Sequence, residues 1–103
     1  MEKEIKKYPS FESLIDEIKD KANPTLDVKD AANSLYNYLQ KKSDSGAPKE
    51  TLGKEIIEGR AFGSEIERKI VGNILKPYYE SSNIDYTNVI DDVIDYLQYI
   101  LNN

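Results

Sequence analysis

The chain has 103 residues, the size of one domain, and contains neither cysteine nor histidine. This excludes disulfides, thiolate chemistry and the commonest general base and metal ligand, so we expect a non-enzymatic single domain over residues 1–103 without catalytic, cofactor or metal site. The net charge of −5 is unevenly distributed, because residues 77–103 hold five of the 19 acidic residues and none of the 14 basic ones.

The first half of the chain predicts two helices. Ser10 is a candidate N-cap for the first, whose apolar residues recur at helical spacing as far as Ala22. Asn23-Pro24 is expected to end it, because the residue before proline avoids the α region. Thr25 or Asp27 is expected to cap the second helix. Its apolar face contains Val28, Ala31, Ala32, Leu35 and Leu39.

Two further helices are predicted in the middle of the chain. Pro48 suits the first turn of the third helix, and the apolar pattern then breaks at Gly59–Gly63, which is either a turn or a weak point in one longer helix. Ser64 followed by Glu67 is a capping box, so a fourth helix should begin there. Pro77 is expected to kink or end this helix.

The last predicted helix begins near Asp85, and Ile84 and Val89 are spaced for a hydrophobic staple at its start. A helix this apolar on one face must pack against the other helices. Its apolar residues are Tyr86, Val89, Ile90, Val93, Ile94, Leu97, Ile100 and Leu101.

These stripes predict mutual packing, because isolated helices of this length are only marginally stable in water. No run of residues combines the alternation of a strand with the turn chemistry of a hairpin. We therefore predict an all-α fold, an antiparallel bundle of four to five helices.

The sequence predicts a cytoplasmic protein without a membrane span. Met1–Lys7 is charged, and no stretch has the apolar length of a signal peptide core or a transmembrane helix. The lack of cysteine fits a reducing compartment.

Aspartate and tyrosine gather on the last helix. Asp91, Asp92 and Asp95 repel one another and have poor helix propensity, so stability does not explain them. Tyrosine supplies rigid amphipathic area at protein interfaces. We predict that the three aspartates form a partner-binding face with exposed Tyr96 and Tyr99. The alternative is that the acids serve solubility and that the rings lie at the seam of the bundle.

Other kinds of site fit the sequence less well. A hard cation needs six or more oxygens, usually from a loop that wraps it, which a straight helix cannot supply. The segment from Lys54 to Lys76 has a modest basic side, but acidic residues are interleaved with it, so we do not expect direct nucleic-acid binding.

A family resemblance rests on Leu35-Tyr36-Asn37-Tyr38-Leu39-Gln40-Lys41-Lys42, the Gly46-Ala47-Pro48 loop, and the following Leu52 and Ile56. This segment resembles the bacteriocin immunity proteins of Gram-positive bacteria, especially the enterocin A immunity family, and the similarity spans about half of the chain. The resemblance implies a cytoplasmic protein that protects its host against a secreted toxin through a membrane receptor complex. Members of that family often end in a partly basic tail, whereas this chain ends in an acidic helix.

We therefore expect a small immunity or inhibitor protein that neutralises a toxin or enzyme by stoichiometric protein binding. One alternative is a phage-type acidic inhibitor of a nucleic-acid enzyme, comparable to an anti-CRISPR protein or a DNA mimic. Another is a helical adaptor or small subunit of a larger assembly.

Overall fold

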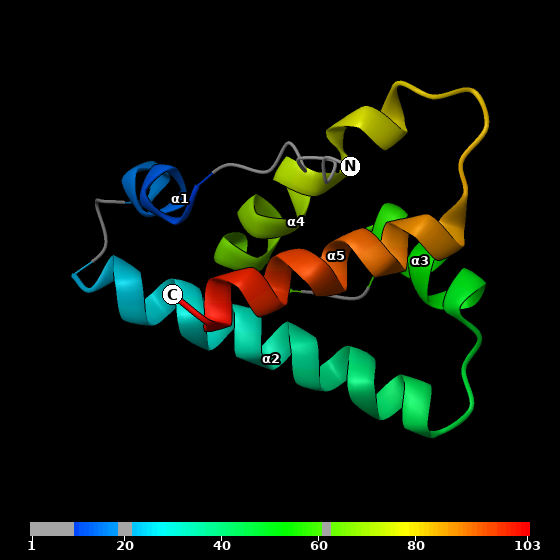
Figure 1. Ribbon diagram of the computed structural model, residues 1–103, viewed down its shortest axis with the longest axis horizontal. Coiled ribbons are helices and arrows are strands. Elements are labelled where there is room, and N and C mark those ends of the chain that lie inside the picture. Colours follow the sequence, from blue (N-terminus) through cyan, green and yellow to red (C-terminus); the bar gives the residue numbers. More distant parts are fainter. Residues whose placement is uncertain (1–9, 19–21, 61–62) are drawn as a thin grey trace, which may run out of the picture.

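The computed structural model describes residues 10–18, 22–60 and 63–103, and within these ranges it consists of helices joined by loops, without strands (Figure 1). The predicted all-α bundle is confirmed. Helices α2 and α5 run side by side in opposite directions, α3 packs mainly against α5, and α4 packs against both α2 and α5. The helices are α1 (Phe11–Glu17), α2 (Pro24–Asp44), α3 (Lys49–Ile57), α4 (Glu65–Tyr79) and α5 (Tyr86–Leu101).

The start of the bundle agrees only in part with the sequence pattern. The Ser10 side chain accepts a hydrogen bond from the Ser13 N–H and caps α1 as predicted, but α1 ends at Glu17 and Ala22 lies exposed outside it. The predicted caps of α2, Thr25 and Asp27, are wrong. Asn23 is the N-cap instead, because Pro24 fits the first helical position, where no backbone donor is needed.

Glycines end α2 and α3. Gly46 and Gly59 have φ angles of 99° and 75°, in the left-handed region that favours glycine. The Ala47 N–H donates to the Lys42 carbonyl at 3.1 Å, and the Arg60 N–H donates to the Glu55 carbonyl at 2.9 Å. These bonds close Schellman motifs, so the break after α3 is a true helix end.

Helix α4 begins and ends differently from its neighbours. It starts at the predicted capping box, which both Ser64 and Glu67 complete. It does not end at Pro77 but continues to Tyr79. Proline removes one backbone donor and disturbs the preceding turn, so the residues after it can remain helical.

One apolar core joins the five helices, and every buried side chain in the described ranges is apolar or is Tyr96. Gly53 allows α3 to lie directly on the start of α5, since a Cβ atom at this position would stand 2.1 Å from the Tyr86 carbonyl oxygen. Among the described helices, none is long and apolar enough to cross a membrane. From α5 the core receives Val89, Ile90, Val93, Tyr96, Leu97 and Ile100.

Candidate functional site

Asp91 and Asp95 lie on the side of α5 that faces away from the core. Asp95 is exposed, and the Asp91 side chain is 48% exposed. Lys49, at the start of α3, places its Nζ atom 2.9 Å from Asp91 Oδ1. The charge of Asp91 is thus partly compensated by a lysine 42 residues away, which the sequence did not reveal. The pair is solvent-exposed, so its attraction is screened by salt.

Asp92 points toward α4. Its Oδ2 atom accepts a hydrogen bond from the Tyr78 hydroxyl, and the residue is partly buried. The contact joins the last turn of α4 to the middle of α5. A hydrogen bond to a carboxylate is among the stronger polar contacts in a protein, so Asp92 has a structural role in addition to its charge.

Tyr96 is not exposed, contrary to the prediction. Its ring is fully buried, because the residue follows Val93 by three positions and precedes Ile100 by four, on the inward side of α5. Burial raises the pKa of the Tyr96 hydroxyl well above its ordinary value, and the nearby Tyr99 and Glu17 raise it further. Tyr96 is therefore part of the core beneath the outward side of α5 and is not available for direct contact with a partner.

Tyr99 is the exposed member of this pair, at 39% of its accessible surface. Its ring stacks on Tyr96, with 5.9 Å between centroids and 12° between planes. Its hydroxyl oxygen accepts a hydrogen bond of 2.8 Å from the Phe11 N–H, one of the donors left unpaired at the start of α1. The ring is held in place between α1 and α5, and the rest of it remains accessible.

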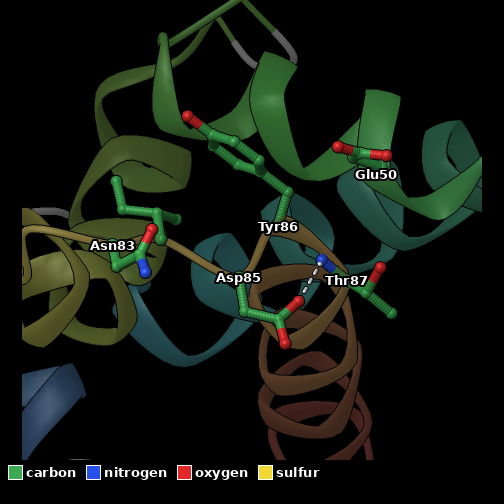
Figure 2. A pocket seen from close by; sticks show the side chains of 6 residues that line it. Glu50, Asn83, Asp85, Tyr86 and Thr87 are labelled. Atoms are coloured by element: carbon green, nitrogen blue, oxygen red, sulfur yellow. Dashed lines mark hydrogen bonds between the residues drawn. The ribbon is translucent and has the colours of Figure 1, made fainter.

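The structure also reveals an acidic cleft at the start of α5, which the sequence analysis missed. Figure 2 shows Glu50 of α3 near the turn that precedes α5. Asp85 caps α5 by accepting from the Thr87 and Asn88 N–H groups, and the Lys54 Nζ lies 5.9 Å from the centre of the Tyr86 ring. The cleft has a volume of about 440 Å³ and is lined by Glu50, Asn83, Ile84, Asp85, Tyr86 and Thr87.

The outward side of α5 therefore carries an acidic surface supported by tyrosines. We call Asp91, Asp92, Asp95 and Tyr99 the α5 surface. Within the described ranges, no group of three or more acidic side chains is arranged to hold a metal ion. Asp85 and Glu50 extend the negative charge toward the start of the helix.

The chain matches no protein-family model, no curated protein and no solved structure. The chemistry of the α5 surface is therefore the basis for assigning a function.

Proposed function

We propose that this protein is a small immunity or inhibitor protein that neutralises a toxin or an enzyme by stoichiometric binding, and that it acts in the cytoplasm. The observation that supports this role most strongly is the α5 surface. Asp91 and Asp95 face solvent on a helix whose sequence region, residues 77–103, contains no lysine or arginine.

A surface that remains mainly acidic, with Lys49 paired to Asp91 alone, favours a basic partner. Such a patch speeds the encounter with an oppositely charged protein, and the effect weakens as salt screens the charges. The exposed part of Tyr99, held by the Tyr96 ring and by α1, suits an anchor whose contacts slow dissociation. Asp92 contributes charge while it holds α4 against α5.

The test is capture of the partner by matched variants. The unmodified protein, Asp91→Asn with Asp95→Asn, and Asp30→Asn with Asp44→Asn would each be immobilised and exposed to extract from the source cells. Asp30 and Asp44 are exposed on α2, so the second pair makes the same charge change away from the α5 surface. We expect only the α5 pair to lose the bound protein.

The identity of the captured protein separates the candidate functions. A membrane permease with its toxin supports bacteriocin immunity, whereas a nuclease or another nucleic-acid enzyme supports an acidic inhibitor. A multisubunit assembly that includes the chain supports a helical adaptor.

Kinetics with the purified partner complete the test. The α5 pair should slow association, mostly at low salt, and Tyr99→Ala should speed dissociation. Circular dichroism of each variant serves as the control for folding. Equal association rates for the α5 pair and the α2 pair would remove the α5 surface from the binding site.

A further inference from the structure

A second charged face lies on α4 and has the opposite sign. Arg68, Lys69 and Lys76 are all exposed on the outward side of this helix, and Tyr79 is 59% exposed beside them. The acidic residues on this side stand at the two ends of α4, Glu65 in the first turn and Glu80 at the C-cap. We call Arg68, Lys69, Lys76 and Tyr79 the α4 basic face.

Gly72 stands at the centre of the α4 basic face. Glycine is among the least favourable residues in a helix interior, so it calls for a reason. A Cβ atom at Gly72 would meet no described atom within 4 Å, and its φ angle is not positive, so neither packing within the described chain nor backbone geometry requires glycine. Glycine is useful where another backbone must approach closely.

Two cationic residues flank the open space beside Gly72. Arg68 and Lys76 lie four residues before and after it, on the same ridge of the helix, about 12 Å apart along the axis. A second helix, roughly 10 Å in diameter, can cross at Gly72 with one cation on each side. The best counterpart is an outward helix face with carboxylates along it.

The chain itself supplies such a helix. We propose that the α4 basic face binds the α5 surface of a second copy of this protein, with α5 crossing α4 at Gly72. Asp91 and Asp95 are four residues apart on the outward side of α5, within reach of Arg68 and Lys76 of the other copy. The overall charge of −5 disfavours nucleic acid as the occupant, because the acidic remainder of the molecule repels a polyanion.

Self-association in this way covers the α5 surface. It therefore competes with binding of the partner described above, and release from the self-associated form becomes a condition for inhibition. The contact between copies is measured on the protein alone, so its failure leaves the proposed function intact.

The experiment is sedimentation of the full-length protein from micromolar to millimolar concentration, at low and at high salt. We expect assemblies that grow with concentration and dissociate at high salt. Arg68→Glu with Lys76→Glu should weaken self-association by roughly tenfold or more, as should Asp91→Lys with Asp95→Lys. An equimolar mixture of these two double variants should associate again, because each retains one intact face and the two reversed faces carry opposite charge.

Two further variants serve as controls. Gly72→Gln fills the gap without changing charge, so it should weaken self-association while the helix content and thermal stability stay equal or rise. Lys41→Glu with Lys42→Glu changes the charge equally at the end of α2 and should leave the contact unchanged.

Three results overturn the proposal: a monomer at every concentration, double variants that fail to associate when mixed, or unchanged self-association of Gly72→Gln. A short DNA duplex that binds the monomer and is lost with Arg68→Glu and Lys76→Glu would instead assign the α4 basic face to nucleic acid.

Discussion

Gly53 and Gly72 both lie inside helices, but their surroundings differ. At Gly53 an added Cβ would collide with the backbone of Tyr86, whereas at Gly72 it would meet no described atom. The first glycine lets α3 and α5 touch, and the second gives the isolated molecule no packing benefit.

The same substitution at these two positions should therefore have opposite effects. Gly53→Ala should destabilise the protein by about 1–3 kcal/mol, because α3 must move away from the start of α5. Gly72→Ala should stabilise it by about 0.5–1 kcal/mol through helix propensity. Denaturant unfolding of both variants at a concentration where the protein is monomeric measures the difference. Similar free energies of unfolding for the two would contradict the close contact at Gly53.

Three acidic residues at or near α5 have partners that are close in space. Asp85 caps α5, Asp91 pairs with Lys49, and Asp92 accepts from Tyr78. The inference from sequence that stability has no part in the aspartates of α5 is wrong for Asp92. Lys49 and Tyr78 are distant along the chain, so only the packed helices reveal these contacts.

At the scale of the helix, the capping box fixes where α4 begins. The Ser64 Oγ accepts from the Glu67 N–H at 3.1 Å, and Glu67 Oε1 accepts from the Ser64 N–H at 3.4 Å. These contacts satisfy backbone donors that the first turn leaves unpaired.

Ser64→Ala should cost about 1 kcal/mol, because it leaves the Glu67 N–H without its side-chain acceptor. Ser34, exposed in the middle of α2, provides the matched control, since alanine there should be neutral or slightly stabilising. Thermal and denaturant melts of the two variants test this. A stabilising Ser64→Ala would mean that α3 and α4 form a continuous helix in solution.

Most helix caps that depend on adjacent residues were predictable from sequence, with the exception of Asn23, which caps α2 by accepting from the Leu26 N–H. Ser10, Ser64 and Asp85 each cap a helix through bonds to residues two or three positions away. The early end of α1 had no comparable signal. The start of α1 also has a contact that the sequence does not reveal, because its first N–H donates to the Tyr99 hydroxyl, 88 residues further along the chain.

At the scale of the molecule, the apolar stripes predicted a bundle but not how its helices pair. Periodicity places Val93 and Ile100 on one face of α5, but Tyr96 lies near the edge of that face, where a tyrosine suits either core or solvent. The structure places Tyr96 in the core, with the Tyr99 ring stacked on it and Glu17 of α1 nearby. The candidate site was therefore correct for the exposure of Asp95 and Tyr99, and wrong for Tyr96.

The burial of Tyr96 should make the stability of the whole molecule fall at alkaline pH. Its pKa is raised in the folded state, chiefly by burial, so the folded protein keeps the phenolic proton. The unfolded chain loses this proton near pH 10, the ordinary tyrosine value. Above about pH 10 the unfolded state binds fewer protons than the folded state, and the free energy of unfolding decreases by up to about 1.4 kcal/mol per pH unit from this group.

Tyr96→Phe removes this contribution, so its free energy of unfolding should decline less steeply than that of the unmodified protein between about pH 9 and pH 11. The offset between the two proteins below pH 9 reports the lost hydroxyl contacts and does not enter the comparison of slopes. Absorbance at 295 nm provides the control. The unmodified chain, with its eight tyrosines, should form one tyrosinate more than the variant, and this difference should appear only once the protein unfolds. Parallel stability curves over this range would mean that the Tyr96 hydroxyl reaches solvent and that the ring belongs to the exposed part of the α5 surface after all.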